Sequence, residues 1–221
     1  MSNSTEAGIV MLLAFGWFIF ISTLMMLVRL NGHGSWTDDV TSDGFNQILI
    51  FETLILAITF CFLWCRGWSW SDLNLGCSIN HIRDAIILLV VTMIILSTVF
   101  AALKAAGIYA VGDGAGTSVK GDVNWYFLVP SILVNSFYEE FFLLCYLFKR
   151  LDRSTPVMII GISTLIRVSY HTYQGPLGWI SLLVMGIIMA WYYHKFKNLT
   201  APMLMHTFWN LLIFAQSIFK Q

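Results

Sequence analysis

The sequence predicts an all-α fold, a polytopic bundle of about seven transmembrane helices in a lipid bilayer. Of its 221 residues, 58% are hydrophobic and 11% are charged. The mean hydropathy is +0.76, which is far above that of an average soluble domain. Apolar runs recur along the whole chain, and a run of about 20 residues crosses a hydrocarbon core about 30 Å thick. We therefore expect one transmembrane domain, residues 1–221.

Seven apolar segments are the candidate spans, in chain order at residues 7–28, 45–65, 84–106, 125–148, 156–170, 177–193 and 199–219. The first has no basic amino-terminal region and no cleavage pattern, so we expect a retained span and not a signal peptide. The fifth is short, and Arg167 and His171 weaken its apolar character. Six spans plus a re-entrant segment therefore remain an alternative.

The charges in the connecting loops predict the orientation of the bundle. Basic residues gather in alternate loops, at Arg66 and Arg83, at Lys149, Arg150 and Arg153, and at Lys195 and Lys197. Because Lys and Arg are retained on the cytoplasmic side, the amino terminus is predicted to be cytoplasmic and the carboxy terminus external. Short loops without a targeting segment favour the plasma membrane of a bacterium or an archaeon.

Two further patterns concern the partners of the chain. Trp64, Trp68 and Trp70 follow one another at the end of the second span, where indole rings favour the headgroup level of a bilayer. The 12 basic and 12 acidic residues balance, and no basic block interrupts the chain. We expect contact with lipid and no nucleic-acid partner.

Glu139 and Glu140 form an acidic pair inside the fourth span. An ionised carboxylate at the bilayer centre costs about 2.5 to 3.5 kcal/mol, so the pair needs an explanation. Glu140 precedes Lys149 by nine residues, which places the pair about 15 Å below the cytoplasmic edge. Two carboxylates this close resist ionising together, and such a group suits general base catalysis on water. A structural pair satisfied by Tyr or Asn partners remains an alternative.

Polar residues on two later spans are the other candidates. His206 and Asn210 are four residues apart and share one face of the last span. Both can donate hydrogen bonds to an oxyanion in a site poor in water, although a polar contact between helices is an alternative. Arg167 lies one turn before His171. An intramembrane Arg almost always pairs, and the acids on offer are Glu139, Glu140 and Glu52.

These motifs, in their order and spacing, resemble the three motifs of the CAAX-protease and bacteriocin-processing proteins, also called the Abi family, over about residues 123–214. The resemblance implies an intramembrane glutamate protease that cleaves a peptide or membrane-protein substrate. By it, Glu139 activates water with His171, Glu140 orients or tunes Glu139, and His206 and Asn210 stabilise the oxyanion. It implies no metal and no cofactor, with zinc held by one Glu and two His as the alternative.

Two positions depart from the family pattern. The first motif usually reads Glu-Glu-xxx-Arg, but Leu144 stands at the Arg position, and Arg167 stands where the second motif has an aromatic residue. We expect Arg167 to supply the positive charge that Leu144 lacks. The departures leave a second function open, a non-proteolytic scaffold or bacteriocin-immunity protein that binds a membrane partner. His171 also lies about 22 Å along its helix, so that helix must tilt or begin late to bring His171 to Glu139.

Overall fold

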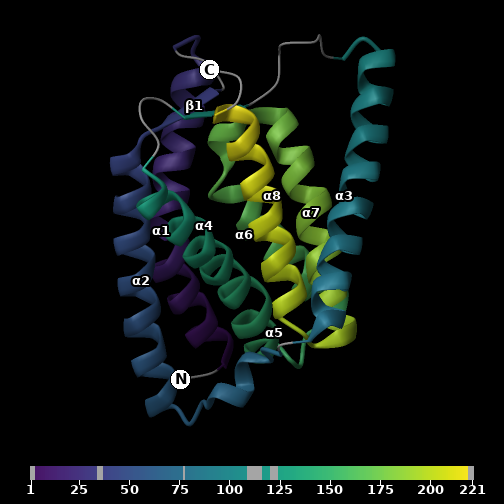
Figure 1. Ribbon diagram of the computed structural model, residues 1–221. Coiled ribbons are helices and arrows are strands. Elements are labelled where there is room, and N and C mark those ends of the chain that lie inside the picture. Colours follow the sequence, from purple (N-terminus) through teal and green to yellow (C-terminus); the bar gives the residue numbers. More distant parts are fainter. Residues whose placement is uncertain (1–2, 34–36, 77, 109–115, 120–123, 219–221) are drawn as a thin grey trace.

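Long apolar helices make up most of this computed structural model, which describes residues 3–33, 37–76, 78–108, 116–119 and 124–218. The long helices are α1 (Asn3–Leu30), α2 (Ser42–Cys65), α3 (Ile79–Ala105), α4 (Trp125–Glu140), α6 (Pro156–Ser169), α7 (Gly175–Phe196) and α8 (Thr200–Ile218). Each predicted span falls on one of them. The chain is therefore a helical membrane bundle, as the sequence predicts (Figure 1).

Short helical segments complete the described chain. They are the 3-10 helix η1 (Trp70–Leu73), the π-helix η2 (Phe141–Tyr146), α5 (Leu147–Arg150) and the 3-10 helix η3 (Thr172–Gln174). Strands β1 (Thr37–Val40) and β2 (Gly116–Val119) pair in parallel, which the all-α prediction did not include. The pair joins two connections between spans, and connections have backbone groups that no helix satisfies.

The helices begin where a side chain can accept a hydrogen bond from the free backbone N–H groups of the first turn. Thr41 accepts from Gly44 before α2, and Ser78 does so before α3. Asn124 caps α4 in the same way. Thr155 caps α6, which also has a proline in its first turn, where the missing N–H costs nothing. Local sequence therefore determines these starts.

Five helical stretches within the described residues are long and apolar enough to cross a membrane, and they are Asn3–Leu30, Ser42–Cys65, Ile79–Ala105, Trp125–Arg150 and Thr172–Phe196. Helix α6 has 14 residues, a length of about 21 Å that is less than the hydrocarbon thickness. It therefore ends within the bundle, and the residues after it lie at membrane depth. This matches the predicted weakness of the fifth span.

The stretch Trp125–Arg150 is the centre of the bundle. In its most apolar window 61% of residues are buried, against 17% to 39% for the other four stretches. Helix α4 packs against α2 and α8, and α6 packs against α7. Outward-facing apolar side chains on the other helices, such as Leu12, Ile58 and Ile94, suit contact with lipid tails. A polar group on the central stretch is consequently shielded from lipid.

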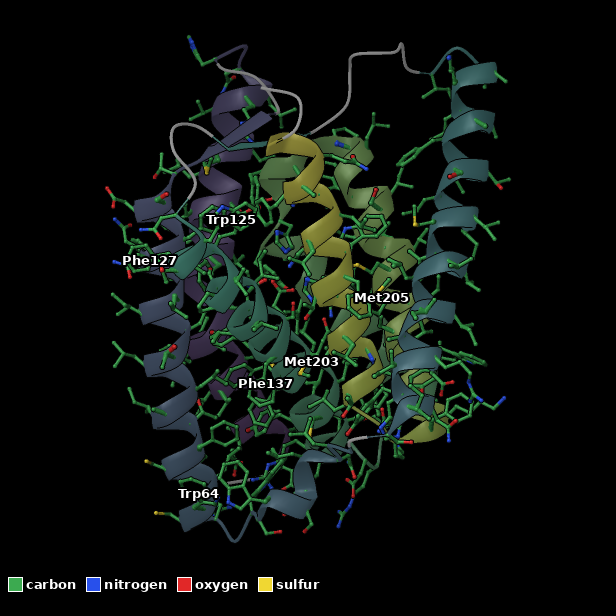
Figure 2. All side chains as sticks on the ribbon, in the orientation of Figure 1. Trp64, Trp125, Phe127, Phe137, Met203 and Met205 are labelled. Atoms are coloured by element: carbon green, nitrogen blue, oxygen red, sulfur yellow. The ribbon has the colours of Figure 1, made fainter. Side chains whose placement is uncertain are left out.

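The ends of the bundle follow the charge pattern of the loops. The start of α1 lies at the same end as α5 and the basic α5–α6 connection, and the end of α8 lies at the opposite end (Figure 1). Trp64 lies at the amino-terminal end of the bundle (Figure 2) and is exposed, as is Trp70. Trp68 is instead buried, and Lys149 lies over its ring. The anchor predicted from three tryptophans therefore has two members.

Candidate active site

Polar side chains of α4, α6 and α8 come together around Arg167 in α6, which is completely buried. Its Nη1 donates to Glu139 Oε2 at 3.1 Å. Its Nη2 donates to both oxygens of Glu140, at 2.9 Å and 2.7 Å. One guanidinium therefore joins two adjacent buried carboxylates and offsets much of the cost of their desolvation.

The backbone after these two acids departs from α-helical geometry. The π-helix begins at Phe141, directly after Glu140, and its six residues are all buried. Adjacent side chains of an α-helix point about 100° apart, yet Glu139 and Glu140 both bond the same guanidinium. A π-turn inside an α-helix is rare and is frequent at functional sites. The turn changes the packing of the span at the place where both carboxylates meet Arg167.

Glu139 has a different set of polar neighbours on each of its two oxygens. The Tyr170 hydroxyl donates to Oε2 at 2.5 Å, and the Asn135 amide donates to Oε1 at 3.2 Å. Nε2 of His171 lies 3.7 Å from Oε1. Oε2 thus takes the bonds from Tyr170 and Arg167, and Oε1 faces His171. This asymmetry matters because Oε2 is occupied by two donors, whereas Oε1 accepts only from Asn135 and can still bond a reactant.

Glu140 has a different environment from Glu139. Its Oε1 lies 2.7 Å from Nδ1 of His206, and its two oxygens accept from Arg167. The other ring nitrogen of His206, Nε2, lies 4.0 Å from Glu139 Oε2. Glu140 therefore orients His206 toward Glu139, while the bonds from Arg167 also hold Glu140 in place. The two adjacent acids differ in their partners.

Asn210 takes a position that the sequence did not predict. Its Nδ2 donates to Oδ1 of Asn135 at 3.5 Å, the long limit of a hydrogen bond. Asn135 in turn donates to Glu139 and to Glu52 of α2. Sequence reasoning named Glu52 only as an acid on offer to Arg167 and missed Asn135 and Tyr170. The available signals were that Asn135 precedes Glu139 by one helical turn and that Tyr170 adjoins His171.

His171 lies in a turn just beyond the end of the short helix α6. The helix ends at Ser169, and His171 lies in the turn before η3. Helix α1 holds this turn, because the backbone N–H of Tyr173 donates to Ser22 Oγ at 3.0 Å and Arg29 donates to the Tyr173 carbonyl. Nδ1 of His171 lies 3.3 Å from the Tyr173 hydroxyl. The first span thereby fixes a residue of the site.

Leu144 lies in the π-helix and is completely buried. It carries no charge toward the acids, and Arg167 reaches them from α6. The two departures from the family pattern thus concern the same feature, a guanidinium beside Glu139 and Glu140. It is absent at Leu144 and is supplied by Arg167.

Close packing of α6 on α7 places Arg167. A Cβ added at Gly186 would lie 3.1 Å from Thr164 Cγ2 and 3.5 Å from Arg167 Cδ. We expect Gly186→Leu to separate the two helices and to destabilise the protein by about 1–3 kcal/mol, as overpacking does. Thermal unfolding in detergent measures the effect. Gly161→Leu is the matched control, because nothing lies within 4 Å of its added Cβ; equal Tm values for the two variants would contradict the prediction.

Some of these side chains could also bind a metal ion, which is the alternative that the sequence left open. Single donor atoms of Glu139, Glu140 and His206 lie within 4.8 Å of one another, a grouping that a metal ion could use. Arg167 donates to both of these carboxylates. Its permanent positive charge occupies the position beside them where a second cation would be repelled. Arg167 thus supplies one positive charge against the two carboxylates.

Comparison with known proteins agrees with the residues that converge here. No curated protein and no solved structure matches the chain. Residues 121–212 match the family model described as type II CAAX prenyl endopeptidase Rce1-like. This stretch contains Glu139, Glu140, His171, His206 and Asn210. The resemblance drawn from the sequence motifs is confirmed by this match, which covers the part of the chain that carries them.

Proposed function

We propose that the protein is an intramembrane endopeptidase that hydrolyses a peptide bond in a peptide or membrane-protein substrate with water activated by Glu139. One observation carries the proposal, the 3.7 Å between Glu139 Oε1 and His171 Nε2. That distance is longer than a direct hydrogen bond, and a water molecule beside the pair can bond both atoms. The side chain of His171 is 19% exposed, so water can reach it.

The reaction follows from the two faces of Glu139. Water between Oε1 and His171 gives a proton to Glu139 as its oxygen attacks the substrate carbonyl carbon. Arg167 and Tyr170 hold Oε2 and keep Oε1 toward the water. Collapse of the tetrahedral intermediate breaks the C–N bond, and the proton on Glu139 passes to the leaving amine. No net proton is gained or lost.

The developing oxyanion needs hydrogen-bond donors in a site shielded from water. His206 is the first candidate, because Glu140 holds its Nδ1 and thereby directs Nε2 toward the space beside Glu139, where a ring N–H can donate to the oxyanion. Asn210 is the second. Its bond to Asn135, at 3.5 Å, is weak enough to be exchanged for a bond to the oxyanion. These are the roles that the family resemblance implies.

We expect hydrolysis to be independent of metal. Glu139 supplies the base, His206 and Asn210 supply donors for the oxyanion, and Arg167 places a positive charge beside the acids, so none of these functions needs an ion. Cleavage of a membrane-anchored peptide reporter by purified protein should stay within about twofold of its initial rate after dialysis against 1,10-phenanthroline, since removal of an essential metal ion would abolish it. A zinc protease treated in parallel serves as the control. Loss of cleavage that added Zn²⁺ restores would contradict a metal-independent mechanism.

A second candidate function is a non-proteolytic scaffold that binds a membrane partner. The dense bonding of Glu139 favours it, since Asn135, Arg167 and Tyr170 all donate to this carboxylate. The bonds from Arg167 and Tyr170 tie α4 to the end of α6 whether or not a reaction takes place. Loss of cleavage on a single change at Glu139 separates the two candidates, and the Discussion describes that experiment.

The positions of the basic connections also support an orientation of the bundle in the membrane. We propose that the protein is a multi-pass protein of a bacterial or archaeal plasma membrane with a cytoplasmic amino terminus. The basic α5–α6 connection, which contains Arg153, lies at the same end of the bundle as the start of α1 (Figure 1). The preference of basic loops for the cytoplasm supports this orientation. Because α6 starts at that end, Arg167 lies on a helix that enters the membrane from the proposed cytoplasmic side.

A further inference from the structure

Glu52 in α2 is a buried acid outside the mechanism proposed above. It lies in the middle of a membrane-spanning helix and is 2% exposed. Its Oε1 accepts from Asn135 Nδ2 at 2.7 Å, and its Oε2 has no hydrogen-bond partner among the described residues. A carboxyl group at this depth is costly, and such groups mark functional sites. The short bond to Asn135 shows where Glu52 acts.

The Asn135 carboxamide connects three helices. Its Nδ2 has two hydrogens, which serve Glu52 Oε1 at 2.7 Å and Glu139 Oε1 at 3.2 Å. Its Oδ1 accepts from Asn210 of α8 at 3.5 Å. A carboxamide is planar, so a rotation by half a turn would exchange its N–H groups and its oxygen. That rotation would turn an oxygen lone pair toward two carboxyl oxygens, and Glu52 opposes it.

We propose that Glu52 and Asn135 are positioning residues for the hydrolysis, in which Glu52 holds the orientation of the Asn135 amide. The amide then fixes Glu139 Oε1, the oxygen that faces His171, and keeps Asn210 beside it until substrate binds. Neither residue is required to touch the substrate. The inference rests on the proposed function, since it assigns a purpose to the orientation of Glu139. It extends the site from α4, α6 and α8 to α2, outside the residues 121–212 that match the family.

A pair of substitutions at Glu52 tests the acceptor role. Glu52→Gln keeps an oxygen for the Asn135 N–H, whereas Glu52→Leu removes it. We expect Glu52→Leu to lower kcat at least about tenfold with KM changed less than about twofold, because misplacement of a catalytic group acts on the chemical step. Glu52→Gln should retain kcat within about threefold. Thr59→Val, at a second buried polar residue of α2, is the control and should retain wild-type kcat.

A spectroscopic measurement makes the test independent of proteolysis. The ¹⁵N side-chain amide signal of Asn135, assigned by its loss in Asn135→Leu, reports the hydrogen bonds of the carboxamide. We expect it to shift in Glu52→Leu and in Glu139→Gln, and to stay in place in Thr59→Val. An unchanged signal in Glu52→Leu would overturn the proposal even if cleavage fell, because cleavage could fall through misfolding. Equal kcat values for Glu52→Leu and wild type would overturn it as well.

The two arms separate failure of this inference from failure of the proposed function. If the wild type cleaves the reporter and the Asn135 amide signal does not shift in Glu52→Leu, the proposed protease function is supported and the positioning role of Glu52 is rejected. If the Asn135 amide signal shifts in both Glu52→Leu and Glu139→Gln but the wild type does not cleave the reporter, the hydrogen bonds from Asn135 to the two acids are supported. That second result rejects the proposed function and, with it, the role of these bonds in hydrolysis.

Discussion

Glu139→Gln is expected to lower the kcat for cleavage of a membrane-anchored reporter at least about 10³-fold, because a carboxamide cannot accept the proton of the attacking water and general base catalysis contributes about 10² to 10⁴. The substitution preserves the shape of the side chain and an oxygen for one of its donors. Mass spectrometry of the reporter, after incubation with purified protein in liposomes, measures the products and the bond that is cut.

The matched control for that experiment is Glu6→Gln. Glu6 is also completely buried, and Arg66 and Arg150 pair with it outside the site. A variant at Glu6 that cleaves like the wild type shows that loss of a buried carboxylate does not by itself stop the reaction. Undiminished cleavage by Glu139→Gln would reject Glu139 as the base. A folded wild type that leaves every reporter uncut would favour the scaffold.

Arg167→Leu is expected to have the largest effect on stability. It would leave Glu139 and Glu140 without their shared guanidinium, and removing one partner of a buried ion pair costs about 3–5 kcal/mol. We expect loss of thermal stability and of cleavage at least as severe as that of Glu140→Gln. Arg167→Lys should restore only part of both, because an ammonium cannot reproduce the forked bonds to two carboxylates. Thermal unfolding and reporter cleavage measure the two effects.

The exchange between Leu144 and Arg167 has its own test. Leu144→Arg, combined with Arg167→Leu, recreates the Glu-Glu-xxx-Arg pattern and places a guanidinium one turn beyond Glu140. We expect the double variant to be more stable than Arg167→Leu alone. Leu144→Arg by itself should destabilise the protein, because it places a second buried guanidinium in a fully packed segment whose two acids are already bound by Arg167. Full tolerance of Arg167→Leu, or a double variant worse than both single changes, would refute the exchange.

The sequence alone determined the span pattern and the chemistry of the central acids. Hydropathy located the helices because lipid requires long apolar segments with satisfied backbones. The cost of burying Glu139 and Glu140 made them candidates, and the same cost predicted that Arg167 would pair with an acid. Each of these conclusions follows from the free-energy cost of placing a charge or an unpaired backbone N–H in hydrocarbon. That cost can be judged from the sequence without knowledge of the packing.

Tertiary structure decided how the polar groups are shared among helices. Sequence spacing placed Asn210 beside His206, yet its amide bonds Asn135 of α4, and Glu52 of α2 joins them through the same residue. The π-helix after Glu140 also escaped prediction. Hydrogen bonds are directional and short, so partners on helices far apart in the chain are chosen by packing. Hydropathy sets which residues enter the membrane, and the packed bundle sets which of them meet.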